Sequence, residues 1–457
     1  MEVMEVSKME CLPDDALVAV LQFVDNEDIL QCRLVCRRWR DLASHPGVWR
    51  YRHITAEYLH LSPPCCSKLI LDEENLVSCA VLAATTTTAA ASLDLFFSPS
   101  FADDADPEIE AVLCALVIRH HGLLGRLKEV GFQVHLSQYS FENAGVMDLL
   151  GSVLSLKGLQ ALNLRVTEGK IETPLPLTGR LDWSVAPSSL QKLSYYGPKT
   201  GELLNFLLRT HASTLREVNL YGMNYCDKVV KLLADITHLD TLACPLLVGL
   251  EHLPQRHSLK CLKINVLVKD SGHAAQTAFS STLTFLQTAT QLTRVCLRTP
   301  YVTDSLWTMN LIKALGHSPQ SAISCLEFEM MRTSDDQMCD ILNIASKLPL
   351  LEKLTVGCVS PYILSALQPG TIPKLTELLV ESVQGDCPCC SWRMARDMIK
   401  RNPRLKLTVK DQPYGRTCKA CERKCRDVYP WYDCLFSGLT LDVINKGRWK
   451  FCSLSNV

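Results

Sequence analysis

Four cysteines near the C-terminus have a spacing that could bind a metal ion. Cys387 and Cys390 form one C-x2-C pair, and Cys418 and Cys421 form a second pair after 27 intervening residues. Two such pairs supply the four thiolates of a structural zinc site. The alternative is a cluster of free thiols, because a helix-like and a strand-like segment separate the two pairs. We therefore expect no cofactor other than a structural zinc ion, provided that these pairs converge.

A second group of reactive residue types lies near the N-terminus. The stretch CRLVCRRWRDL, residues 32–42, combines two cysteines with four arginines, as metal sites, redox pairs and phosphate-binding surfaces do. On a helical projection, Cys32, Cys36 and Trp39 share one arc, and the arginines lie outside it. We interpret the stretch as one packed helix whose cysteines face inward and whose arginines face solvent. Leu34 lies among the arginines on the solvent-facing side, so we expect it to contact a partner protein.

The overall charge and cysteine content exclude several classes of protein. The chain has 457 residues with 47 basic and 48 acidic side chains, and this balance argues against a nucleic-acid-coating protein. Its 22 cysteines are scattered and its start is acidic, which predicts free thiols in the cytoplasm, the nucleus or both. The uncharged segment Leu76–Leu93 is too weakly apolar for a membrane span. No nucleotide-binding or hydrolase motif indicates an enzyme.

The first fifty residues predict short amphipathic helices. Leu17, Val20, Leu21 and Val24 recur at helical spacing, and the DNED segment from Asp25 ends that helix and starts the next. The stretch begins with Leu-Pro and continues with this acidic turn, a Val-Cys-x-x-Trp segment and a later tryptophan. In these features it resembles an F-box. The resemblance implies a three-helix domain that binds the Skp-type adaptor of a cullin-RING ubiquitin ligase of the SCF type.

The size of this piece also argues for a partner. About 40 to 50 residues without disulfides or an evident metal site bury too little apolar surface to be comfortably stable alone. Carried over by position from the resemblance, the candidate adaptor contacts are Leu12, Pro13, Leu17, Val20, Leu21, Ile29, Leu30, Leu34 and Val35.

Beyond residue 120 the chain repeats the pattern L-x-x-L-x-L, followed each time by a helix-like segment. Eleven copies lie 20 to 33 residues apart, starting at Leu127, Leu159, Leu190, Leu215, Leu239, Leu259, Leu292, Ile323, Leu351, Leu375 and Asn402. Stacking such units buries leucines that no single unit could hide. The pattern resembles the irregular leucine-rich repeats that follow an F-box in many proteins, and it predicts a curved parallel sheet.

Alternate residues of these strands should face the concave side of the sheet. Those positions include the candidate target contacts Tyr196, Tyr221, Lys263, Arg298, Glu327 and Glu329. Aromatic anchors flanked by charges are typical of a protein-binding surface. An ordinary solvated face is the alternative interpretation.

The predicted fold class is α/β. We expect a tail over 1–10, the F-box over 11–55 and a linker or irregular early repeat with a low-complexity insertion over 56–106. The leucine-rich-repeat solenoid should follow over 107–410, and a cysteine-rich cap over 411–457. The predicted function is a non-catalytic substrate receptor of an SCF-type ligase. A repeat scaffold that joins no ligase is the alternative, and a C-terminal metal-binding module is a third interpretation.

Overall fold

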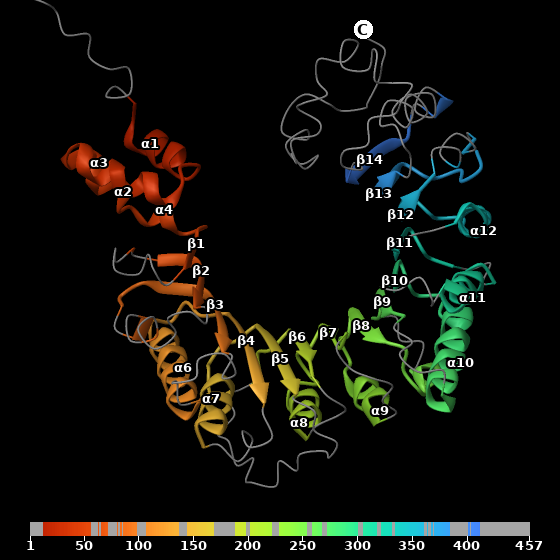
Figure 1. The fold of residues 1–457 in the computed structure, drawn as a ribbon, viewed down its shortest axis with the longest axis horizontal. Helices are drawn as coiled ribbons and strands as arrows, with labels where there is room; N and C mark the ends of the chain where they lie inside the picture. Colours follow the sequence, from red (N-terminus) through yellow and green to blue (C-terminus); the bar gives the residue numbers. More distant parts are fainter. Residues whose placement is uncertain are drawn as a thin grey trace, which may run out of the picture. The chain divides into compact units, whose positions relative to one another are not determined.

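The structure is a computed structural model of the chain. It describes residues 12–55, 63, 65–71, 80, 83–84, 86–97, 107–136, 144–168, 188–197, 202–221, 228–253, 258–266, 272–299, 305–317, 321–330, 334–360, 363, 367–368, 370–383, 401–402 and 404–411. The chain forms two compact units, unit 1 (Met1–Leu215) and unit 2 (Arg216–Val457). Figure 1 labels the helices and strands of both units.

Unit 1 begins with four short helices (Figure 1), which enclose a small apolar interior. They are α1 (Asp14–Leu21), α2 (Asn26–Val35), α3 (Arg37–Ala43) and α4 (Pro46–Trp49). Asp25 is the N-cap residue of α2, as the DNED segment predicted. The interior consists of the buried side chains Leu17, Leu21, Ile29, Leu42, Ala43, Val48 and Trp49.

The prediction of one continuous helix over residues 32–42 is wrong. Cys36 has an extended backbone with φ −161° and ψ 174°, so α2 ends before it and α3 begins after it. The break turns α3 back so that it packs against both α1 and α2. Cys36 is consequently exposed rather than inward-facing, and Cys32 and Trp39 are only partly buried.

A parallel sheet with helices on one face follows directly in unit 1. Its strands are β1 (His53–Thr55), β2 (Cys65–Leu71), β3 (Ala89–Phe97), β4 (Glu129–Leu136), β5 (Ala161–Glu168) and β6 (Lys192–Tyr196). Each strand pairs in parallel with the next. Helices α6 (Pro107–Leu123), α7 (Ala144–Leu154) and α8 (Glu202–Thr210) lie along one side of the later strands (Figure 1). The opposite face is called the open face below.

The repeat begins earlier than the predicted boundary at residue 107, because β1, β2 and β3 belong to the same ladder. Strand β3 lies within residues 56–106, where the sequence predicted a linker or an irregular early repeat. Cys66 and Ala90 lie at the position where later repeats have their first leucine, and both are buried. The repeat pattern is therefore intact in this segment, with smaller apolar residues in place of leucine.

Unit 2 continues the same alternation of strand and helix. Its strands are β7 (Glu217–Asn219), β8 (Thr241–Pro245), β9 (Cys261–Asn265), β10 (Arg294–Thr299), β11 (Cys325–Met330), β12 (Lys353–Val359), β13 (Glu377–Val383) and β14 (Lys406–Asp411). Successive strands pair in parallel from β7 to β14. Helices α9 (Lys228–Asp235), α10 (His273–Thr288), α11 (Ser305–Leu315) and α12 (Asp335–Ser346) cover one face (Figure 1), and a 3-10 helix η3 spans Leu250–His252.

All eleven predicted repeats contain a strand at the predicted place. The leucines of each strand pair in register with those of the next, for example Val295 with Leu326, and both are buried under the helices. The last repeat is shifted by two residues from the prediction, since Leu407 rather than Leu405 aligns with Leu378. A shift of two preserves the alternation of faces, so Leu407 still points inward. Within the described residues, no helix is long and apolar enough to span a membrane.

Candidate protein-binding surfaces

The N-terminal helices expose several large apolar side chains to solvent. Leu34 is 75% exposed and Val35 is 68% exposed, and both lie at the end of α2. Val20 on α1 and the preceding Leu12 and Pro13 are exposed too, so five predicted adaptor contacts are available to a partner. A helical piece whose interior is already filled has no internal use for these side chains. This surface, formed by Leu12, Pro13, Val20, Leu34 and Val35, is called the helical apolar surface below.

Three other predicted contacts lie inside the domain instead. Leu17, Leu21 and Ile29 have no exposed surface, because they pack between the helices. They support the helical apolar surface from within and cannot touch a partner in this conformation. The side chain of Leu30 lies outside the described residues. Phe23, which follows α1, is 83% exposed, and the sequence did not single it out because it lies off the apolar stripe of α1.

Arg52 fastens the helices to the first strands of the sheet. Its guanidinium donates to the carbonyl oxygens of Leu21 and Val24, each at 2.6 Å, where α1 has ended. It also donates to Asn26 Oδ1 and to Val48 O, each at 2.9 Å, and lies over the Trp49 ring. Burial lowers the pKa of Arg52, and nearby Asp25 opposes that effect. One residue thus donates to main-chain oxygens near the ends of two helices, α1 and α4.

The main chain at Arg52 completes this junction. Its carbonyl oxygen accepts from Ser67 N at 2.8 Å and from Lys68 N at 3.3 Å, both on β2. Asn26 Nδ2 donates to His53 O on β1. The helices and the first strands of unit 1 are therefore joined by direct hydrogen bonds, which holds the helical apolar surface at a fixed orientation to this part of the sheet.

The predicted target contacts of unit 2 lie on the open face, and three of the five already form ion pairs. Glu327 on β11 pairs with Arg294, and Glu329 pairs with Arg298 at 3.6 Å. Lys263 is half-buried on β9. Tyr221 is half-buried as well, and burial raises its pKa with smaller effects from Cys296 and Cys244. Tyr221 is therefore less accessible than a surface anchor requires.

Tyr196 of unit 1 differs from Tyr221. It is 46% exposed on the open face of β6, and the Arg165 guanidinium lies 5.2 Å from its ring centroid. An exposed tyrosine beside an arginine combines the two residue types most enriched at the centres of protein interfaces. Of the two predicted tyrosine anchors, the structure leaves Tyr196 open to a partner.

Comparison with known families agrees with the geometry of the N-terminal helices. Residues 9–55 match the family described as F-box-like. The chain carries an F-box-like domain. The predicted resemblance is therefore confirmed, with the F-box-like domain followed by a parallel repeat of strands and helices.

Solved structures add little to this identification. The chain is similar to a plant peptide hormone receptor, RGFR1, described in complex with RGF2, at 11% sequence identity and a TM-score of 0.29. The match covers 79% of this chain and 49% of that chain, so this chain spans about half of the receptor's length. Similarity at this level carries no argument about ligands.

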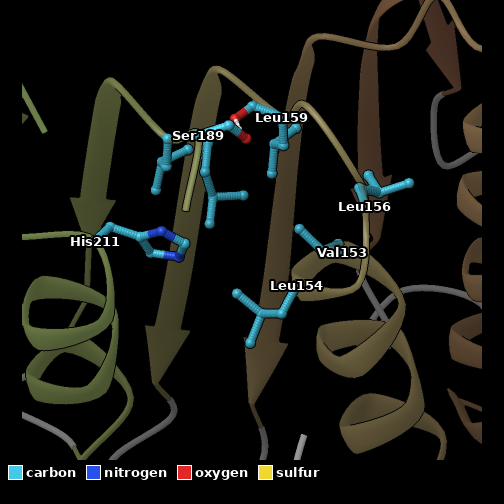
Figure 2. Close-up of a pocket in the computed structure, with 8 residues that line it drawn as sticks. Val153, Leu154, Leu156, Leu159, Ser189 and His211 are labelled. Carbon is cyan, nitrogen blue, oxygen red and sulfur yellow. Dashed lines mark hydrogen bonds between the residues drawn. The ribbon is translucent and has the colours of Figure 1, made fainter. Parts of the chain in front are cut away.

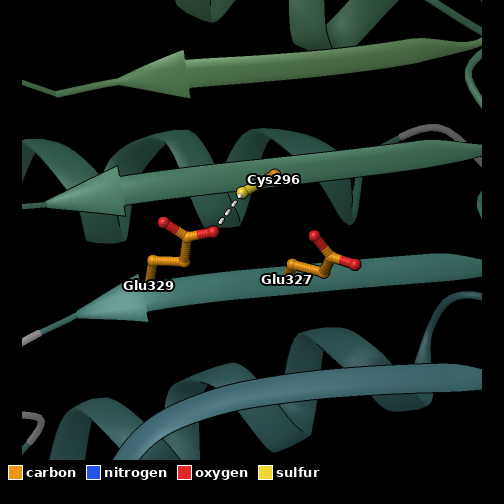
Figure 3. Close-up of side chains that lie close together, drawn as sticks. All are labelled: Cys296, Glu327 and Glu329. Carbon is orange, nitrogen blue, oxygen red and sulfur yellow. Dashed lines mark hydrogen bonds between the residues drawn. The ribbon is translucent and has the colours of Figure 1, made fainter. Parts of the chain in front are cut away.

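A group of metal-ligating residue types lies on the open face of unit 2. The ligand atoms of Cys296, Glu327 and Glu329 lie within 4.8 Å of one another (Figure 3). The Cys296 thiol donates to Glu329 Oε1 at 3.7 Å, and burial followed by the two carboxylates raises its pKa. A protonated thiol beside carboxylates already paired with arginines favours a structural network over a metal site.

A small hollow in unit 1 is lined mainly by leucines, with Ser189 and His211 at its polar side (Figure 2). Ser189 Oγ donates to Leu159 O at 2.8 Å, and His211 Nδ1 lies 3.0 Å from Ser188 Oγ. Burial lowers the pKa of His211. These contacts join the loops of neighbouring repeats, so the hollow has a structural role. The predicted zinc ligands Cys387, Cys390, Cys418 and Cys421 lie outside the described residues and remain a prediction.

Proposed function

We propose that this protein is a substrate receptor of an SCF-type ubiquitin ligase. Its F-box-like domain would bind the Skp-type adaptor, and through it a cullin-RING ligase, while the open face of the sheet binds a target protein. The receptor needs no catalytic residue of its own, because holding the target near the ligase supplies proximity and orientation. Such a ligase would act in the cytoplasm or the nucleus, where free thiols persist.

One observation carries this proposal. The F-box-like domain has a complete interior, yet it leaves Leu34, Val35 and Val20 exposed on its surface. Burying such side chains against a partner stabilises a complex by about 1.5–3 kcal/mol each when fully removed from water. The helical apolar surface is therefore suited to an apolar partner surface, as the F-box-like match leads one to expect.

The junction at Arg52 supports the second half of the proposal. Ser67 N and Lys68 N of β2 donate to Arg52 O, and Asn26 donates to His53 O of β1, so hydrogen bonds connect the helices with both strands of unit 1. A target bound on the nearby open face would consequently keep one orientation relative to the adaptor. Flexible tethering would supply proximity but not this constant orientation.

The test is complex formation between the purified full chain and a purified Skp-type adaptor, measured by gel filtration with light scattering. We expect a 1:1 complex for the unmodified chain and at least a tenfold weaker one for Leu34→Glu, which corresponds to about 1.4 kcal/mol. Leu306→Glu is the matched control, because Leu306 on α11 of unit 2 is also 75% exposed. It should bind like the unmodified chain.

Two outcomes would contradict the proposal. The unmodified chain could fail to bind the adaptor, which would leave a repeat scaffold that joins no ligase. Alternatively, Leu34→Glu and Leu306→Glu could bind equally well, which would show that the helical apolar surface does not bind the adaptor. Addition of the cullin-RING components to the adaptor complex then tests ligase assembly by ubiquitin transfer to the chain or its partners.

A further inference from the structure

Four residues of unit 1 form a row across the open face, one on each of the strands β3 to β6. Phe96 pairs in register with Gln133, Gln133 with Arg165, and Arg165 with Tyr196. The residues that precede them along the strands form the matching inner row of Leu95, Phe132, Leu164 and Tyr195, which are all buried. Because side chains alternate along a strand, the four outer residues share the open face. They are called the β3–β6 row below.

The β3–β6 row exposes an aromatic ring at each end. Phe96 is 38% exposed and Tyr196 is 46% exposed. Between them, Arg165 lies 5.2 Å from the centroid of the Tyr196 ring, and its Nη1 donates to Gln133 Oε1 at 3.4 Å. The guanidinium is thus positioned by neutral neighbours on both sides. Stacking and one neutral hydrogen bond leave its other donors and its charge for a ligand.

The charge of Arg165 is not neutralised within the described part of the chain. Asp94, a carboxylate on the same face, pairs with Lys68 and lies over Gly131, where any side chain would collide with it. By contrast, the arginines Arg294 and Arg298 on the open face of unit 2 each pair with a glutamate. The β3–β6 row therefore lacks the anionic group that completes comparable positions elsewhere in the sheet.

We propose that the β3–β6 row binds an extended segment of a partner protein that carries an Asp or Glu side chain between two apolar side chains. The carboxylate would pair with Arg165, and the apolar side chains would contact Phe96 and Tyr196. Three steps between strands span about 14 Å, and an extended chain covers this distance in about four or five residues. A side-chain carboxylate fits better than a chain terminus, because the segment must continue in both directions to reach both rings.

This inference rests on the proposed target-binding role of the open face and names the chemistry of the target. It does not depend on adaptor binding. The adaptor complex is measured on the same preparations, so either idea can fail while the other stands. Loss of adaptor binding contradicts the ligase proposal, and loss of peptide selectivity contradicts the β3–β6 row.

The test begins with a library of random dodecapeptides displayed on phage and selected on the purified full chain at about 0.15 M salt, which screens non-specific charge attraction. We expect selected sequences to contain Asp or Glu flanked by apolar or aromatic residues. A consensus peptide, synthesised with an amidated C-terminus and a fluorescent label, is then titrated by anisotropy. Amidation excludes binding through the terminal carboxylate.

Charge reversal provides the decisive arm. Arg165→Glu should weaken binding of the consensus peptide at least tenfold, and Arg165→Lys should weaken it less. Arg209→Glu is the matched control, because it makes the same charge change on exposed Arg209 of α8 in the same unit. Selection repeated on Arg165→Glu should enrich Lys or Arg in place of the acid. Selection without acidic enrichment, or equal binding to Arg165→Glu and Arg209→Glu, would overturn the proposal.

Discussion

The open faces of the two units are built from the same repeat but treat their charges differently. In unit 2, Glu327 and Glu329 pair with arginines on β10. Glu377 on β13 lies between Lys353 at 2.9 Å and Lys406 at 3.6 Å. In unit 1, Arg165 is held by a glutamine and a tyrosine ring and has no carboxylate partner among the described residues.

This difference indicates which face is prepared for a ligand. Charges that pair within a sheet must be separated before they can bind a partner. The energy needed to separate them offsets much of the binding energy that the new pair would supply. An arginine held in place by neutral groups has no such pair to break. This difference supports the proposed target-binding row in unit 1, and we interpret the described charges of unit 2 mainly as structural.

The largest expected loss of stability follows from a change at Arg52, which joins the helices of unit 1 to its first strands. Arg52→Ala removes hydrogen bonds to Leu21 O and Val24 O, and it should lower the local stability of α1 and α4 by about 3 kcal/mol. Hydrogen exchange of amides in these helices should then quicken by about 100-fold. Exposed Arg50 provides the control, since Arg50→Ala should leave exchange unchanged. Equal exchange in both variants would show that Arg52 fastens nothing.

Acid should weaken the two units in different pH windows. Burial, followed by the neighbouring His120, lowers the pKa of His121 on α6 from 6.5 to about 4. In the unfolded chain, His121 therefore takes up a proton below pH 6.5, whereas in folded unit 1 it does so only near pH 4. The free energy of unfolding of unit 1 is highest above this window and should fall by about 2 kcal/mol between pH 7 and pH 5.

Unit 2 should respond at lower pH. The hydrogen bond from Lys353, with the charge of Lys406, lowers the pKa of Glu377 from 4.5, so its contribution is present above pH 4.5 and is lost below it. Hydrogen exchange at pH 7 and pH 5 distinguishes the units. His121→Leu should flatten the response of unit 1, and the exposed control His317→Asn should not. An unchanged pH response in His121→Leu would contradict this assignment.

The smallest expected changes in the free energy of unfolding come from removing a paired glutamate of unit 2 and Arg165 of unit 1. Glu327 is largely buried and accepts from Arg294 and from the Cys325 thiol, so Glu327→Ala should lower the free energy of unfolding by about 1 kcal/mol. Arg165→Ala should lower it by less than about 0.5 kcal/mol, because Arg165 is exposed and forms no ion pair within the described residues. Urea unfolding measures both. A larger loss for Arg165→Ala than for Glu327→Ala would reverse the comparison.

Much of the fold was predictable from the sequence because regularly spaced leucines mark the strand positions that are buried. Each L-x-x-L-x-L copy became a strand, with Leu162 and Leu193 as typical paired positions. The start of the regular repeat was predicted too late because Cys66 and Ala90 replace leucine there and do not stand out among neighbouring small residues. A residue that is merely small and apolar carries a weaker signal than a large one.

The sites were harder to predict because they depend on neighbours that are distant in sequence. Helical periodicity continues through Cys36, so it gives no sign of the break that exposes this residue. The raised pKa of Tyr221 results first from its burial and then from groups on other strands, Cys296 and Cys244, which are distant in sequence. Similarly, Phe96 and Arg165 come to lie in one row only through the register of two strand pairs, β3 with β4 and β4 with β5.

The proposed ligase role depends on binding of a Skp-type adaptor by the helical apolar surface of the F-box-like domain. Hydrogen exchange of the full chain, measured with and without saturating purified adaptor, tests it most directly. We predict slower exchange in α1 and α2, around Val20 and Leu34, and unchanged exchange in β9 to β14. Unchanged exchange throughout the F-box-like domain, or protection confined to the sheet, would contradict the claim.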